Sequence, residues 1–179
     1  MLYTMHYDSP IGRLLLMEKE EALTGLWIEG QKYFLGTLRE NMEEKKDSSI
    51  LNRTKDWLDR YFRGEKPQIS ELTLEPMGSE FRKMVWKILC EIPYGEVTTY
   101  GDISRKIADN RGIDRMSAQA VGQAVGHNPI SIIIPCHRVV GTGGSLTGYA
   151  GGLQRKVSLL TLEGVSMENL FVPAKGTAL

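Results

Sequence analysis

Cysteine, histidine and long apolar runs are all scarce in this sequence. Its 179 residues include two cysteines and three histidines. Two cysteines are too few for a disulfide framework, and at these scattered spacings the five residues form no recognisable zinc pattern. No apolar run approaches the roughly 18 residues needed to cross a bilayer. The first residues, MLYTMHYDSP, lack the basic head and apolar segment of a signal peptide. We therefore expect a cytoplasmic protein with free thiols, no metal, no cofactor and no membrane partner.

Net charge is absent as well. The chain has 22 lysines and arginines and 22 aspartates and glutamates, in an ordinary globular composition of 41% hydrophobic and 25% charged residues. Residues 1–78 carry 11 basic against 14 acidic side chains, a net −3, and residues 79–179 carry 11 against 8, a net +3. The second half is the better place to look for a phosphate-backbone partner, although so small a difference identifies none by itself.

Residues 1–76 are predicted to form a small α/β domain. Three short apolar runs with turn signals between them indicate an antiparallel meander; they cover residues 2–7, 13–17 and 23–30. Apolar side chains at helical spacing predict a helix over residues 50–63. Residues 67–78 are expected to be a linker with a short strand at 72–75. The sheet would carry the helix on one face.

Residues 77–179 are predicted to form a second, mostly helical domain. Apolar spacing and stop signals place four helices, at 79–92, 100–108, 117–128 and 153–164. The second and third are separated by a loop and followed by extended chain, which is typical of a helix-turn-helix. The predicted fold class is therefore α+β. The third helix, AQAVGQAVG, is built from small residues, which suit either close helix packing or close approach to DNA.

The two cysteines lie in different settings. Cys90 falls on the apolar face of a predicted helix, where most cysteines are inert. Cys136 follows Pro135 and precedes His137 and Arg138, with glycine-rich chain soon after. A free thiol is only a few per cent ionised at pH 7, so a nucleophilic one needs a base or a positive field. Cys136 is the candidate nucleophile, although extended chain would point Cys136 and His137 to opposite faces.

Three stretches resemble a known family. GHNPISIIIPCHRVVG, GYAGGLQRKVSLLTLEG and VWKILCEIPYGEVTTYGDIS are similar to the C-terminal domain of the O6-alkylguanine-DNA alkyltransferases, the methylated-DNA–protein-cysteine methyltransferases. SPIGRLLLMEKEEALTGLWIEGQ resembles the looser N-terminal pattern of their bacterial members. The resemblance covers nearly the whole chain. It implies a ribonuclease H-like first domain and a winged-helix-like second domain.

The resemblance also implies a reaction. A damaged guanine is flipped out of double-stranded DNA, and the Cys136 thiolate takes the O6-alkyl group irreversibly, so each molecule acts once. His137 would take the thiol proton through a water, and Glu163 would orient the imidazole. Tyr100 would hydrogen-bond or protonate guanine N3, and Asn128 would hold the turn before the active-site run.

The remaining implied residues contact the base and the duplex. The helix from Ser117, with Ala118 and Gln119, would enter the minor groove. The guanine pocket would be lined by residues near the thiol and in the glycine-rich loop: Arg138, Val139, Tyr149, Ala150 and Gly151. Lesion-bearing DNA is the expected partner, O4-alkylthymine is a possible second substrate, and the protein is expected to act as a monomer.

Gln119 departs from the family pattern, which usually has an intercalating arginine at this position. Glutamine can fill the gap left by the base and hydrogen-bond to its partner, but it lacks a charge. The N-terminal domain also lacks the cysteine and histidine set that binds zinc in some relatives.

Three other functions compete with this one. A lesion-flagging binding protein of the same family would replace the nucleophile, which Cys136 argues against. A transcriptional regulator would use the helix-turn-helix alone, but 179 residues leave no room for a further regulatory domain. A thiol hydrolase would turn over many times, where the alkyltransferase reacts once.

Overall fold

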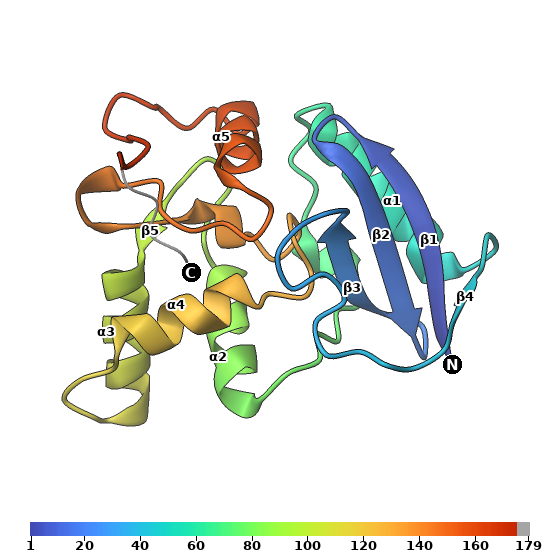
Figure 1. The fold of residues 1–179 in the computed structure, drawn as a ribbon, viewed down its shortest axis with the longest axis horizontal. Coiled ribbons are helices and arrows are strands. Elements are labelled where there is room, and N and C mark those ends of the chain that lie inside the picture. Colours follow the sequence, from blue (N-terminus) through green and yellow to red (C-terminus); the bar gives the residue numbers. More distant parts are fainter. Residues whose placement is uncertain (175–179) are drawn as a thin grey trace. The chain divides into compact units, whose positions relative to one another are not determined.

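The computed structural model describes residues 1–174, which form two compact units (Figure 1). Unit 1 is Met1–Met77 with Pro129–Ile133, and unit 2 is Gly78–Asn128 with the described chain from Ile134 onward. A short segment between the third helix of unit 2 and the candidate cysteine is therefore part of unit 1. No helix within residues 1–174 is long and apolar enough to span a membrane.

Unit 1 is built on a four-stranded sheet in the order β3-β2-β1-β4. The strands are β1 Leu2–Ser9, β2 Gly12–Lys19, β3 Ala22–Ile28 and β4 Met42–Glu44. The first three form the predicted antiparallel meander, but β4 pairs parallel to β1. The sheet is therefore mixed rather than antiparallel throughout. All three residues of β4 are exposed, so no alternation of apolar and polar side chains marks it in the sequence.

Helix α1, Ser49–Phe62, packs on this sheet (Figure 1). The hydroxyl of Ser48 caps it by accepting a hydrogen bond from the amide of Leu51 at 3.2 Å. Its inner face is apolar apart from one threonine, and buries Ile50, Leu51, Thr54, Trp57, Leu58 and Tyr61. The core of unit 1 lies between this face and the strands.

Two short peptides pair with β3. Leu74, which follows the 3-10 turn Ile69–Glu71 (η1), forms a parallel bridge with Leu23, so the strand expected at 72–75 is a single bridge. Ile130 forms another parallel bridge with Leu26, whose amide donates to the carbonyl of Pro129 at 2.8 Å. These bonds satisfy backbone groups that an open strand edge would leave unpaired.

Unit 2 is mostly helical, which together with the mixed sheet confirms the expected α+β class. Its helices are α2 Glu80–Leu89, α3 Tyr100–Arg111, α4 Ala118–Gly126 and α5 Leu153–Leu162. The two-residue strands β5 Thr98–Thr99 and β6 Val139–Val140 run parallel, and Cys136–Arg138 (η2) and Thr142–Gly144 (η3) are 3-10 turns. Ser79, Thr99 and Ser117 cap α2, α3 and α4 through their side chains.

Helix α4 has one packed side and one exposed side. Val121, Ala124 and Val125 are buried, and the indole Nε1 of Trp86 on α2 donates to the carbonyl of Ala124 at 2.8 Å. Gln119 is exposed. Close helix packing therefore accounts for the small residues in the second half of α4, and the first turn remains available to a partner.

The chain bends before and through the candidate cysteine instead of running extended. Ile132 has φ of 72°, a conformation that is rare for a β-branched residue. The 3-10 turn Cys136–Arg138 follows Pro135 directly. Because of this turn, the side chains of Cys136 and His137 are not forced onto opposite faces as in a strand.

Candidate active site

Cys136 is held inside a hydrogen-bonded turn, with 5% of its surface exposed. Its amide donates to the carbonyl of Ile134 at 2.8 Å, and the side-chain amide of Asn128 donates to the same carbonyl at 2.8 Å. Asn128 follows His127, the C-cap residue of α4. Its amide group therefore joins the chain leaving α4 to the turn that presents the thiol.

The two residues after the cysteine both contact one carboxylate. Nε2 of His137 hydrogen-bonds to Oε2 of Glu163, and Nε of Arg138 donates to Oε1 at 2.7 Å. Arg138 also donates to the carbonyl of Ile92 at 2.7 Å, and the amide of Gly95 donates to Glu163 Oε1 at 3.2 Å. These bonds fix the imidazole. Its other nitrogen, Nδ1, is buried without a hydrogen-bond partner among the described residues.

The ionisation of these groups follows from burial and charge. Burial alone would raise the pKa of Glu163, but hydrogen bonds from His137 and Arg138 outweigh it and lower the pKa to about 2. Burial lowers the pKa of His137 despite the carboxylate beside it. Burial also raises the pKa of the Cys136 thiol, and a hydrogen bond with Asn128 opposes this only in part. At neutral pH the site therefore holds a neutral thiol, a neutral imidazole and an ionised carboxylate.

Two tyrosines belong to the same buried region. The hydroxyl of Tyr100 lies 3.3 Å from the carbonyl oxygens of both Thr147 and Gly148, in the glycine-rich loop. The hydroxyl of Tyr149 is buried and makes no hydrogen bond within the described chain. Burial and the charge of ionised Cys136 raise the pKa of each, so both remain protonated donors near the sulfur.

The residues expected to contact the duplex and the base fall into an exposed pair and a group beside the thiol. Ala118 and Gln119 form the exposed first turn of α4, a surface rather than part of the buried cluster. Val139 is fully buried in β6, next to the cysteine turn. Ala150 and Gly151 lie at the end of the glycine-rich loop, just before α5, where the carbonyl of Gly151 accepts a hydrogen bond from Arg155 at 3.1 Å.

Comparison with known proteins identifies the family. Residues 1–76 match the family model for the ribonuclease-like domain of 6-O-methylguanine DNA methyltransferase, and residues 80–165 match the model for its DNA binding domain. The chain belongs to the 6-O-methylguanine DNA methyltransferase family.

Individual relatives of this methyltransferase family cover almost the whole chain. The methylated-DNA–protein-cysteine methyltransferase of Haemophilus influenzae is 39% identical over 162 residues, 90% of this chain and 86% of that protein. Among solved structures, Mycobacterium tuberculosis OGT in complex with DNA is 43% identical with a TM-score of 0.75, covering 90% of this chain and 91% of the other. The M. tuberculosis O6-methylguanine methyltransferase is 39% identical with a TM-score of 0.73, over 98% and 97%.

Lys156 also belongs to the methyltransferase site, although it is not among the residues predicted from the sequence. It is fully buried on α5, and its ammonium donates to the carbonyls of Val139 at 2.5 Å, Thr147 at 3.2 Å and Gly148 at 3.3 Å. Burial lowers its pKa to about 8. The signal that could have found it is its position: Lys156 lies on the apolar face of α5, three residues after Leu153 and four before Leu160.

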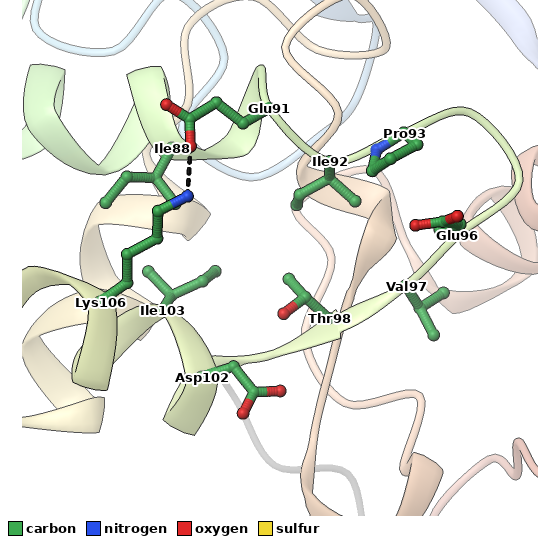
Figure 2. Close-up of a pocket in the computed structure, with 10 residues that line it drawn as sticks. All are labelled: Ile88, Glu91, Ile92, Pro93, Glu96, Val97, Thr98, Asp102, Ile103 and Lys106. Carbon is green, nitrogen blue, oxygen red and sulfur yellow. Dashed lines mark hydrogen bonds and ion pairs between the residues drawn. The ribbon is translucent and has the colours of Figure 1, made fainter.

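A separate pocket of unit 2 contains none of the predicted site residues (Figure 2). It measures about 280 Å³ and is lined by the C-terminal end of α2, the following loop and the start of α3. Its charged side chains are Glu91, Glu96, Asp102 and Lys106, and Lys106 pairs with Glu91. Among the described residues, no group of three or more histidine, cysteine, aspartate or glutamate side chains could hold a metal ion.

Proposed function

We propose that this chain repairs O6-alkylguanine in double-stranded DNA by moving the alkyl group onto Sγ of Cys136. The observation that supports this best is the buried arrangement Cys136–His137–Glu163 next to Tyr100 and Asn128. A thiol with a base beside it, and a carboxylate that orients the base, is the general pattern of an activated nucleophile. The name of the Haemophilus influenzae relative, methylated-DNA–protein-cysteine methyltransferase, describes the same transfer to a protein cysteine.

The proposed step is a displacement at carbon. The thiol proton of Cys136 passes through a water to Nδ1 of His137, the ring nitrogen that Glu163 leaves free. The sulfur attacks the O6-alkyl carbon, a C–S bond forms, and the C–O bond breaks toward the guanine. The leaving base takes a proton from the hydroxyl of Tyr100, and the imidazolium of His137 returns its proton to Tyr100 through water. Restored guanine is released and both side chains are neutral again. The product thioether is not hydrolysed, so the molecule reacts once.

Burial makes this assistance necessary. Because the low-dielectric setting raises the pKa of Cys136, little thiolate is present at neutral pH before the base transfers its proton. The imidazolium that forms next to Glu163 is stabilised by a carboxylate that stays ionised down to a pH of about 2. The charge of Arg138 is balanced by the same carboxylate, and its two hydrogen bonds hold the cluster in place.

We further propose that unit 2 contacts DNA through the first turn of α4, in the minor groove, with the lesion flipped toward Cys136. Gln119 is exposed there and would enter the gap left by the base. Flipping is required because the buried sulfur cannot reach an alkyl carbon inside a base stack. A protein of this family from M. tuberculosis has been crystallised with DNA, which supports duplex binding here. We propose that a monomer suffices.

The decisive experiment is a mass measurement after incubation with duplex DNA containing O6-methylguanine. One methyl group is expected on the peptide containing Cys136 and none on the peptide containing Cys90, the matched second thiol, whose pKa burial raises to about 11. Cys136→Ala should bind the same duplex and transfer nothing. Methyl found only on Cys90, or restored guanine with an unmodified protein, would contradict the proposal, and repeated turnover would indicate a thiol hydrolase.

A further inference from the structure

The glycine-rich loop at the site, residues 141–152, has little intrinsic preference for one shape. Its residues 147 and 148 carry the two carbonyls that lie within hydrogen-bond distance of the Tyr100 hydroxyl. Four of its glycines have positive φ, between 65° and 92°: Gly143, Gly144, Gly148 and Gly152. Glycine enters and leaves this region of backbone space at low cost. Contacts from outside the loop must therefore select the conformation that forms the pocket wall.

Residues 167–171, here called the C-terminal strap, supply such contacts. The amide of Phe171 donates to the carbonyl of Gly144 at 3.1 Å, and the amide of Leu146 donates to the carbonyl of Phe171 at 2.8 Å. Ser145 and Phe171 thereby form a parallel bridge. The strap therefore pairs with the loop through backbone hydrogen bonds, at residues that come just before the two carbonyls near the Tyr100 hydroxyl.

Side-chain and backbone packing reinforce this pairing. Leu170 packs against a buried apolar cluster, Val140, Leu146 and Leu160. A Cβ on Gly144 would lie 1.9 Å from the carbonyl oxygen of Asn169, so the two backbones touch where only glycine fits. The side chain of Phe171, in contrast, is 51% exposed. The strap therefore acts through its backbone bonds and Leu170, and not through the aromatic ring.

We infer that the C-terminal strap is a positioning element for base capture: it holds residues 144–146 so that the following residues, 147–149, form one wall of the pocket for the flipped guanine. This inference rests on the proposed alkyl transfer. The contacts of the strap are with residues 144–146 and the apolar cluster beside them, so loosening it should weaken capture of the base more than the chemical step. Capture is measured without DNA by using free O6-benzylguanine.

The experiment compares two neighbouring proline substitutions. Phe171→Pro removes the N–H that binds Gly144, whereas Val172→Pro alters an exposed residue whose N–H makes no hydrogen bond within the described chain. The rate of benzyl transfer to Cys136 is measured against O6-benzylguanine concentration. Phe171→Pro should raise the half-saturating concentration about fivefold, as expected for one lost hydrogen bond, with a nearly unchanged maximal rate. Val172→Pro and Phe171→Ala should match the parent.

Leu170→Ala is the second variant, and it decides the matter if Phe171→Pro does not fold. It should also raise the half-saturating concentration, because the strap loses its apolar anchor while its backbone bonds remain possible. Unchanged half-saturation in both, with a normal benzyl adduct on Cys136, would overturn the role of the strap and leave the proposed function standing. A parent protein that forms no adduct on Cys136 would overturn the proposed function, and the strap inference with it.

Discussion

Glu163 is the residue on which the buried charges of the site converge, since His137, Arg138 and the amide of Gly95 all bind its carboxylate. Its pKa of about 2 lies below the unfolded value of about 4.3, a difference that corresponds to about 3 kcal/mol. This stability is fully present above the unfolded pKa and is lost as the pH falls toward 2. In a variant without the carboxylate, the free energy of unfolding should therefore fall less as the pH is lowered toward 2.

Glu163→Gln tests this role in two ways. We expect it to slow benzyl transfer by roughly one to a few factors of ten, because the imidazolium loses its carboxylate. We also expect a loss of about 3 kcal/mol in unfolding free energy, because Arg138 is left buried without its counter-charge. Denaturant titration and the rate with free O6-benzylguanine over pH 6–9 measure these effects. The exposed Glu96→Gln is the matched control. Superimposable pH–rate curves for Glu163→Gln and parent would rule out the catalytic role.

The ammonium of Lys156 donates to three backbone carbonyls, those of Val139, Thr147 and Gly148, whereas Arg138 pairs with the Glu163 carboxylate. Its pKa of about 8 and its attraction for ionised Cys136 mean that the two groups titrate together. Above pH 8 the two groups together hold one proton fewer than at neutral pH. The protein is then a mixture of a thiolate–ammonium form and a thiol–amine form. The thiolate fraction should then stop rising with pH, and the transfer rate should level off above about pH 8 in the parent.

In Lys156→Met the transfer rate should no longer level off above about pH 8. Near pH 7 the variant should react more slowly than the parent, because no cation stabilises the thiolate, and its rate should keep rising to higher pH. It should also unfold more easily, by about 1–3 kcal/mol, since carbonyls bound by the ammonium become unsatisfied. Rates between pH 6 and 10 and a denaturant titration give both results. A parent rate that rises without a break through pH 9 would exclude the coupling.

At the scale of elements, apolar spacing and caps predicted the meander, α1 and the four helices of unit 2, because each buries one continuous face. Strand β4 could not be predicted, since its three exposed residues pair through backbone bonds alone. The turn through Cys136 was equally hidden. Every residue from 128 to 140 is buried, so no periodicity distinguishes strand from turn there.

The site was predictable to a similar extent. The motif around Cys136 indicated the nucleophile, and the family resemblance supplied Glu163, which lies 26 residues beyond its partner His137. Lys156 was overlooked because a lone lysine on a helix usually lies in solvent, and its place on the apolar face of α5 was the only signal. Only tertiary structure shows that three carbonyls surround its ammonium.

The first turn of α4 gives a test of how the duplex is bound. Gln119 is exposed there, where family members usually place an intercalating arginine. Gln119→Arg should raise duplex affinity and speed repair of duplex DNA, because a guanidinium both stacks in the gap and attracts phosphates. The rate with free O6-benzylguanine should stay the same, since that substrate needs no flipping.

Gln123→Arg is the control for this comparison. It adds the same charge to an exposed position one turn later on α4, so it should raise affinity without an equal gain in the repair rate. Gln119→Ala should slow duplex repair and spare the free base. If Gln119→Ala repairs duplex DNA as fast as the parent, another side chain fills the gap.

At the scale of the whole molecule, the charge distribution sets how DNA is bound. The chain is neutral overall, and residues 79–179 carry a net +3, so few phosphates can be neutralised at once. The affinity for undamaged duplex, measured with Cys136→Ala, should therefore fall with salt along a shallow line, with a log–log slope of magnitude about 3 or less. Because the minor groove distinguishes little beyond A·T from G·C pairs, duplexes of scrambled sequence should bind almost equally. Fluorescence anisotropy from 50 to 300 mM salt, on several sequences, measures both quantities. A steep slope would show that more phosphates are neutralised than the net +3 of residues 79–179 indicates. A strong preference for one undamaged sequence would indicate a transcriptional regulator instead of a repair protein.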